Sequence, residues 1–446
     1  MTQLIGFRAL MGVGAALIMP STLSILVNVF PPDERTKAIA IWAGVTGAAG
    51  AIGPVASGFI LNNFWFGAVF LVNVPFCALA LVSGWFLLPK SKDPEHGRLD
   101  PLGAILSIVG IVAIVYALIE APDKGWTSAT TLTAFAVGAI VLAIFVAWEL
   151  HVDEPMLDMR YFKNGAFSSG TTGMILVFMA MYGVMFLFMQ YFQLILGYSP
   201  LDAALRFLPM APIMIIVAPL TPRISARIGA NRTVAGGLGL VGLGLILFRG
   251  LGDSTSYLYI LGAIIPLVSG MALAMSPMTA AIMSAVPPRR AGAGSAMNDA
   301  TRELGAALGV AVMGSLAASK YATAVGSLTA DLTPAAQEAA RSSLAGALQV
   351  ASQQPAEIGH ALSQGAINAF VDGIHIAVTV GAVLTWIAAL MVLRYLPAHL
   401  AHRDEPSAVD AVEDVLELGI AGVEPVFDEK RSTFAAGEEP VAQREP

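Results

Sequence analysis

The chain is dominated by apolar stretches of about twenty residues, which are separated by short polar connections. A helix needs about 20 apolar residues to cross the hydrocarbon core of a bilayer, so each stretch has the length of a membrane-spanning helix. The stretches are too long and too evenly apolar for strands of a membrane barrel, which alternate over about ten positions. The sequence therefore predicts an all-α, polytopic membrane protein.

The composition agrees with this interpretation. Hydrophobic residues make up 56% of the chain and charged residues 12%, with a mean hydropathy of +0.73. A soluble globular domain carries about 25% charged residues. The net charge of -7 comes from the acidic segment after Arg403, so charge gives no reason to expect nucleic-acid binding. The single cysteine, Cys77, cannot form an internal disulfide.

We expect about eleven spans, near residues 3–28, 38–60, 66–88, 101–120, 131–150, 167–192, 204–222, 233–250, 257–283, 294–318 and 372–396. Two segments differ in character. Residues 319–371 are rich in Ala, Ser and Gln and are predicted to form a long loop with short helices, one of them starting at Thr333 and Pro334. Residues 397–446 form an acidic tail that is predicted to be disordered.

Basic residues are concentrated in every second connection: Arg35 and Lys37; Lys90, Lys92 and Arg98; Arg160 and Lys163; Arg223, Arg227 and Arg232; Arg289 and Arg290. Because Lys and Arg resist translocation, these connections are expected on the cytoplasmic side of a plasma or inner membrane. The tail is then cytoplasmic, and the loop 319–371 is extracytoplasmic.

Two runs near the N-terminus contain unusual residues for a span. Arg8 lies inside the first span, where a charge costs at least about 2.5 kcal/mol, so it should face a polar cavity or partner. A structural arginine that reaches the interface is the alternative. The second run has small residues at helical spacing and a proline, which favours either ordinary tight packing or a pliant contact between moving helices. Its members are Gly47, Gly50, Gly53, Pro54 and Gly58.

Together these runs resemble the major facilitator superfamily. The first is similar to the R-x-x-x-G signature of the fourth family helix, and the second to the fifth-helix antiporter signature, with Ser57 in place of a glycine. Further motifs resemble the fourteen-helix drug/proton antiporter branch. Residues 100–103 open a pair of spans similar to its two extra helices, and residues 302–310 resemble its penultimate helix.

The resemblance implies a division of the chain. Residues 1–88 would be the remainder of an N-terminal bundle (family helices 4–6), 89–150 two linking helices, 151–396 a six-helix C-terminal bundle, and 397–446 the tail. The first three family helices have no counterpart, so we expect the chain to begin partway through a larger protein of fourteen spans.

Acidic residues inside spans are the candidates for proton coupling, because a poorly hydrated carboxyl can exchange a proton for cationic cargo. Asp299 is the first candidate, and Glu303 and Arg302 follow it at the spacing of one helix face. The alternative is that Asp299 pairs with Arg302 as a structural lock or caps the helix beside water. The branch generally uses acids in its first and penultimate helices.

The sixth span is crowded with methionine and aromatic residues, which suit an adaptable apolar pocket. Its polar members Tyr182, Gln190 and Gln193 are the candidate cavity residues, whereas lipid-facing bulk is the alternative for the others. The sequence has no phosphate-binding loop and no metalloprotease or serine-hydrolase motif. We therefore expect no cofactor, no metal site and no enzymatic activity.

The resemblance implies proton-coupled efflux of amphipathic drugs or related small molecules, with the lipid bilayer, the small substrate and protons as partners. An accessory periplasmic or membrane-fusion partner is left open. The alternative function is that of a non-transporting truncated remnant or a regulatory membrane scaffold.

Overall fold

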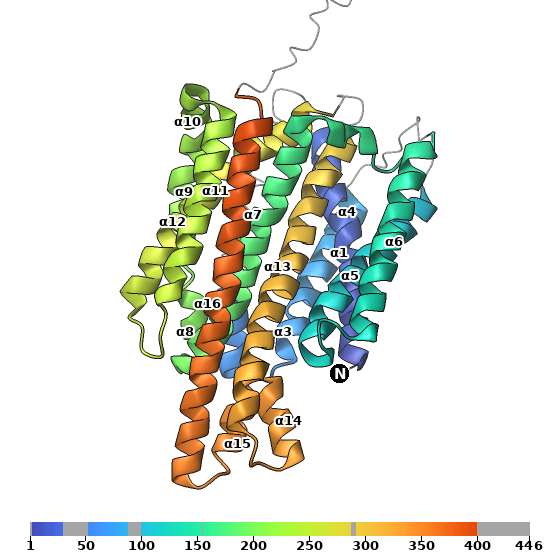
Figure 1. Cartoon of the computed structure of the whole chain (residues 1–446). Coiled ribbons are helices and arrows are strands. Elements are labelled where there is room, and N and C mark those ends of the chain that lie inside the picture. The colour runs from blue at the N-terminus through green and yellow to red at the C-terminus, as the bar shows by residue number, and fades with distance from the viewer. Residues whose placement is uncertain (1, 30–51, 88–99, 154, 287–290, 399–446) are drawn as a thin grey trace, which may run out of the picture. The chain divides into compact units, whose positions relative to one another are not determined.

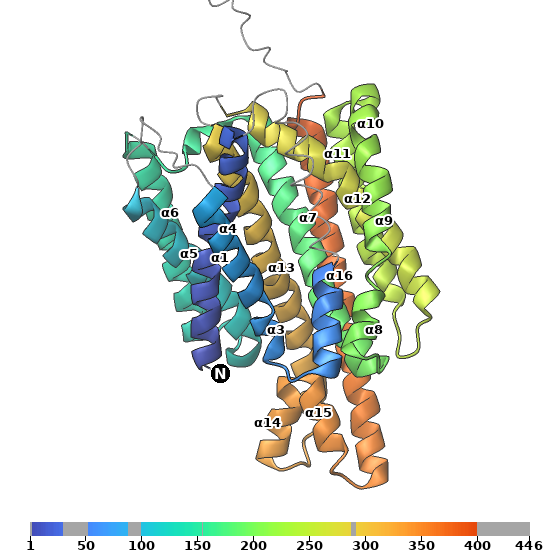
Figure 2. The same cartoon turned by 180° about the vertical axis from the view of Figure 1, so that it is seen from behind.

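The computed structural model describes residues 2–29, 52–87, 100–153, 155–286 and 291–398. Every regular element in these ranges is a helix, and the long helices run side by side as a bundle (Figures 1 and 2). Nine helices of the described residues are long and apolar enough to cross a membrane. The prediction of an all-α membrane protein is therefore confirmed. Residues 30–51, which include most of the second predicted span, and residues 399–446 of the tail lie outside the described residues.

The first part of the chain contributes α1 (Thr2–Val29), a helical segment at residues 52–63, α3 (Ala68–Leu71) and α4 (Asn73–Leu87). A helical hairpin follows, made of α5 (Pro101–Lys124) and α6 (Ala129–His151). Both hairpin helices begin at side-chain caps, because the Asp100 carboxylate accepts from the Gly103 amide and the Ser128 hydroxyl from the Thr131 amide.

The next part begins with the short 3₁₀ turn η1 (Met159–Lys163) and α7 (Gly165–Gln190), which continues into the π-helical turn η2 (Tyr191–Ile195). The span predicted near 204–222 is interrupted, and it consists of α8 (Pro200–Leu205), α9 (Met210–Val217), η3 (Ala218–Leu220) and α10 (Thr221–Ile228). Prolines at these junctions remove helical hydrogen bonds and explain the breaks. The chain then turns into α11 (Ala230–Leu247), η4 (Phe248–Gly250) and α12 (Tyr257–Ser284).

The last two long helices differ from the prediction. α13 (Ala291–Leu328) and α16 (Ala356–Tyr395) both extend into the predicted loop 319–371. Only α14 (Pro334–Ser342), α15 (Leu344–Ala351) and their connections lie between them, and these form the lower end of the molecule in Figure 1. The prediction of a loop was wrong for residues 319–328 and 356–371. These residues are helical but less apolar than the spans, so the hydropathy signal ends before the helix does.

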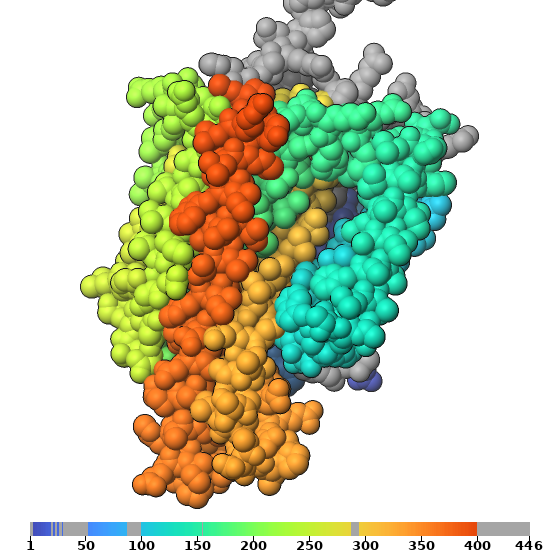
Figure 3. Space-filling model, viewed as in Figure 1, coloured from blue at the N-terminus to red at the C-terminus, as the bar shows by residue number. Residues whose placement is uncertain are grey.

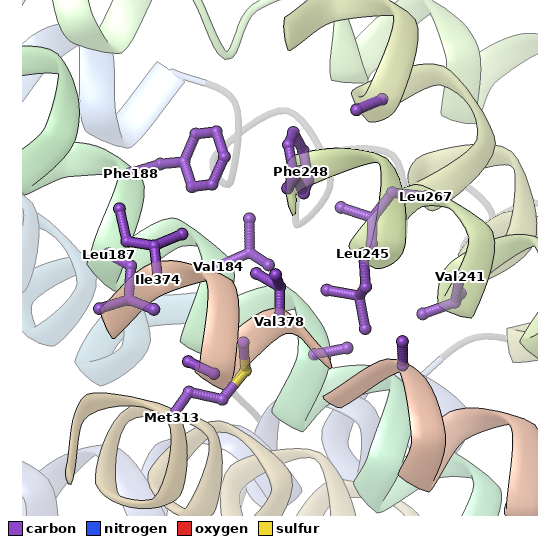
Figure 4. Packing of buried hydrophobic residues seen from close by; sticks show 14 of the residues in the cluster. Val184, Leu187, Phe188, Val241, Leu245, Phe248, Leu267, Met313, Ile374 and Val378 are labelled. Atoms are coloured by element: carbon purple, nitrogen blue, oxygen red, sulfur yellow. The ribbon is translucent and has the colours of Figure 1, made fainter. Parts of the chain in front are cut away.

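Glycine allows the central helices to approach closely. On α13, a Cβ atom at Gly309 would lie 2.9 Å from the Met179 Cα atom of α7, and one at Gly305 would meet the Ile175 backbone. Gly237 of α11 and Gly270 of α12 face each other in the same way. Around these contacts lies a core of large apolar side chains that includes Leu187, Phe188, Leu245 and Val378 (Figure 4).

We predict that Gly309→Ala lowers the unfolding free energy by about 1–3 kcal/mol, since the new methyl group would press on the backbone of α7. Gly262→Ala on α12 is the matched control, because a Cβ atom there would meet nothing within 4 Å. Thermal denaturation of both variants in detergent measures the difference. Equal melting temperatures for the two variants would contradict this packing.

Candidate functional site

An open apolar pocket of about 360 Å³ lies along one face of α7. It is lined by Tyr182, Met185, Phe186, Met189 and Gln190 of α7 and by Val310 of α13. The α7 residues are spaced three and four apart, so they share one helix face. The pocket includes the predicted cavity residues Tyr182 and Gln190.

The opposite face of α7 fixes the orientation of this pocket. Val184, Leu187 and Phe188 are buried in the core, and a Cβ atom at Gly183 would lie 2.9 Å from the Gly309 carbonyl oxygen of α13. Gln193 lies beyond α7 in the π-helical turn and is not among the pocket residues. Its Nε2 atom contacts the Met189 sulfur at 4.0 Å.

The three candidate residues of α13 lie near the end of the bundle at which α13 begins. Asp299 and Arg302 are partly buried, whereas Glu303 is exposed. Among the described residues, no ion pair joins any two of them. Arg302 nevertheless acts on Asp299 electrostatically, and the Asp299 side chain also interacts with that of Asn298, so the pairing that the spacing allowed is present without a close ion pair. The adjacent Asn298 is buried and accepts a hydrogen bond from the Thr279 hydroxyl of α12 at 3.2 Å.

Aromatic side chains connect these charges to the pocket. The guanidinium carbon of Arg302 lies 5.6 Å from the centre of the Phe178 ring, and its buried Nε has no hydrogen-bond partner in the described part of the chain. Phe178 stacks on Tyr182 with ring centres 6.3 Å apart. Glu303 is close enough to Tyr182 to interact with it electrostatically. The charged cluster and the apolar pocket are thus neighbours, joined through Phe178 and Tyr182.

Only some of the candidate residues near the N-terminus lie within the described residues. Arg8 is exposed, and its guanidinium carbon lies 5.3 Å from the centre of the Phe70 ring. Gly47 and Gly50 lie outside the described residues. Among the described residues, a Cβ atom at Gly53 would meet nothing within 4 Å.

Gly58, the last glycine of the antiporter-like run, contacts the second half of the chain. It is buried, and a Cβ atom there would lie 2.8 Å from the Leu201 Cα atom of α8. Nearby, the Asn62 amide donates a hydrogen bond to the Ser199 hydroxyl at 3.3 Å. Sequence reasoning missed Asn62 and Ser199. The one available signal was Ser199 before Pro200, which is typical of a helix N-cap.

No group of three or more potential metal ligands occurs in the described ranges. The geometry is that of an apolar binding pocket next to titratable groups within a membrane bundle. A sequence model described as Major Facilitator Superfamily matches residues 1–310. The chain belongs to this superfamily. It is therefore a membrane transporter rather than an enzyme, as the resemblance implied.

Several curated proteins are similar to this superfamily member. The multidrug efflux pump LfrA of Mycolicibacterium smegmatis is 36% identical over 390 residues, which are 87% of this chain and 77% of LfrA. The multidrug resistance protein Stp of Mycobacterium tuberculosis is 33% identical over 312 residues, which are 70% of this chain and 58% of Stp. The tetracenomycin C resistance and export protein of Streptomyces glaucescens is 30% identical over 403 residues, which are 87% of this chain and 73% of that protein.

We predict that cysteines at positions 62 and 199 are joined by a short bifunctional thiol reagent, since the native Asn62 Nδ2 and Ser199 Oγ atoms are 3.3 Å apart. The background is Cys77→Ser, which removes the single native cysteine. Asn63→Cys with Ser199→Cys is the control, because Asn63 instead donates to the Phe59 carbonyl of its own helix. Mass spectrometry of the joined peptides measures the cross-linking rate of each cysteine pair. Equal cross-linking of the two pairs would contradict the contact.

Proposed function

We propose that this transporter exports amphipathic drugs or related small molecules in exchange for protons. The observation that carries the proposal is the junction of an apolar pocket with the charged groups Arg302 and Glu303 through Phe178 and Tyr182. The similarity to proteins named for multidrug efflux and antibiotic resistance supports the same substrate class.

The pocket suits flat, apolar molecules of varied shape. Methionine side chains adapt to different surfaces, and Tyr182 and Phe186 offer ring faces for stacking. A positive charge on the substrate would be attracted by the ring faces and by the nearby Glu303 carboxylate. The Gln190 amide adds a donor and an acceptor for polar substituents.

Proton exchange would take place at Asp299 or Glu303. A deprotonated carboxylate attracts a cationic substrate, and protonation removes that attraction, so the two ligands compete. Arg302 would bias this competition, because its positive charge favours the deprotonated acid. In the described cluster no ion pair within 4 Å holds either acid, so a substrate cation can compete with Arg302 for Asp299.

Transport requires that the binding site opens alternately to each side of the membrane. The contact of Gly58 with α8 lies where two parts of the chain could separate, and the lack of a Cβ atom at Gly58 lets the backbones meet without interlocking side chains. The α5–α6 hairpin supports placement in the fourteen-helix drug/proton antiporter branch. The distribution of basic residues supports a cytoplasmic position for the upper end of Figure 1 and an extracytoplasmic position for α14 and α15.

We predict that Asp299→Asn abolishes the uncoupler-sensitive part of dye efflux from cells, because an amide cannot exchange a proton. Glu303→Gln, made separately, shows which acid carries the coupling. Asp331→Asn, an exposed acid between α13 and α14, is the control and should retain efflux. Efflux is measured with and without a proton uncoupler at matched expression. Full uncoupler-sensitive efflux in both site variants would exclude this acid pair from coupling.

We predict that Phe186→Ala weakens binding of a cationic dye roughly tenfold, since burying a phenylalanine side chain contributes about 1.5–3 kcal/mol. Leu390→Ala on α16, where the side chain is 68% exposed, is the control. Fluorescence polarisation of the dye with purified protein gives both affinities. An unchanged affinity in Phe186→Ala would place the substrate elsewhere.

A further inference from the structure

Glu149 is a buried acid that the proposed transport site does not use. It lies near the end of α6, and its residue is 2% exposed. Its Oε2 atom accepts a hydrogen bond from the Leu157 amide at 2.9 Å. Its Oε1 atom is buried and has no hydrogen-bond partner among the described residues. An acceptor left without a donor in a buried position costs about 1–3 kcal/mol, and more when it is charged.

The unpartnered oxygen faces a second carboxyl group. Asp100 caps α5 by accepting from the Gly103 amide at 2.8 Å, and the Trp148 indole donates to both of its oxygens at 3.0 and 3.1 Å. Asp100 Oδ2 and Glu149 Oε1 converge on the place where a Cβ atom of Gly103 would lie. Because Gly103 has no Cβ atom, the Asp100 Oδ2 and Glu149 Oε1 atoms can both lie within 2.5 Å of this point, and the two carboxyls act on each other there.

Two ionised carboxylates cannot satisfy each other, because both are acceptors only. One proton changes this, since a protonated carboxyl donates an O–H to its ionised neighbour. Within the described ranges, no basic side chain forms an ion pair with either acid. Among the described residues, the other charge that acts on Glu149 is the Asp158 carboxylate at the start of η1, which is also negative. The surroundings therefore favour a neutral partner over a second negative charge.

We propose that Asp100 and Glu149 together bind one proton, at a site separate from Asp299 and Glu303. The shared proton keeps Glu149 in place as the acceptor of the Leu157 amide, and so attaches the end of α6 to the segment that leads into α7. The site does not depend on the proposed substrate or on the direction of transport.

Because the pair lies at one end of the α5–α6 hairpin, the shared proton affects how that end is attached to the rest of the bundle. The other end of the hairpin is attached to α13, because the Ser315 hydroxyl donates to the Leu118 carbonyl and the Trp126 indole donates to the Ser319 hydroxyl at 2.9 Å. Figure 3 shows the hairpin against α13 at its lower part and a hollow between them above. Loss of the shared proton would therefore loosen the upper attachment of the hairpin and leave the lower one intact.

Infrared spectroscopy of the purified full chain in detergent tests the site directly. The spectrum of the wild type minus that of Glu149→Gln should contain one protonated carboxylic-acid C=O band at neutral pH, and Asp100→Asn should remove the same band. Glu120→Gln is the control, because Glu120 lies on the same hairpin and is ion-paired with Lys124 at 2.7 Å. Absence of the band from both site-variant differences, or its equal loss in Glu120→Gln, would overturn the proposal.

Thermal stability gives a second readout that does not use transport. A group that holds its proton more firmly in the folded state stabilises the fold at low pH, and this contribution is lost as pH rises. The wild-type melting temperature should therefore fall with rising pH by an amount that Glu149→Gln lacks, because the amide supplies a permanent donor to Asp100. An identical pH dependence in wild type and Glu149→Gln would contradict a shared proton.

Discussion

The structure depends on backbone contacts at glycine, because lipid tails are as apolar as leucine and do not drive helices together. Gly305 and Gly309 bring α13 against α7, and Gly237 and Gly270 bring α11 against α12. The first of these contacts fixes the rotation of α7. One face of the helix is thereby buried, and the other presents Tyr182 and its neighbours to the pocket. Packing between small residues thus positions the candidate site.

The acidic side chains of the bundle differ in the groups that surround them. Glu120 is paired with Lys124 near a helix end, so its charge is balanced. Asp299 and Glu303 have no ion pair in the described structure, which suits groups that exchange ligands. Glu149 is buried beside another acid, which is the arrangement that calls for a proton. The surroundings of the carboxyl groups therefore differ in three ways, and our proposals assign them different roles.

Features that depend on neighbouring residues in the sequence could be predicted, whereas features that depend on contacts between distant segments could not. Apolar length predicted the helices of α5, α6, α7 and α12, because hydropathy is a local property of about twenty residues. It failed at the ends of α13 and α16, where the helices continue with less apolar sequence. The cost of an intramembrane charge singled out Asp299, Arg302 and Glu303, but the spacing allowed an ion pair that the fold does not form.

The sequence by itself determined that the chain is a helical membrane protein and which charged residues lie within its spans. Only the tertiary structure decided which of these groups meet. The contacts of Asn62 with Ser199 and of Asp100 with Glu149 join residues on different helices, and their geometry depends on helix rotation and close approach. Rotation and approach are set by packing between distant segments, and no local pattern of residues encodes them.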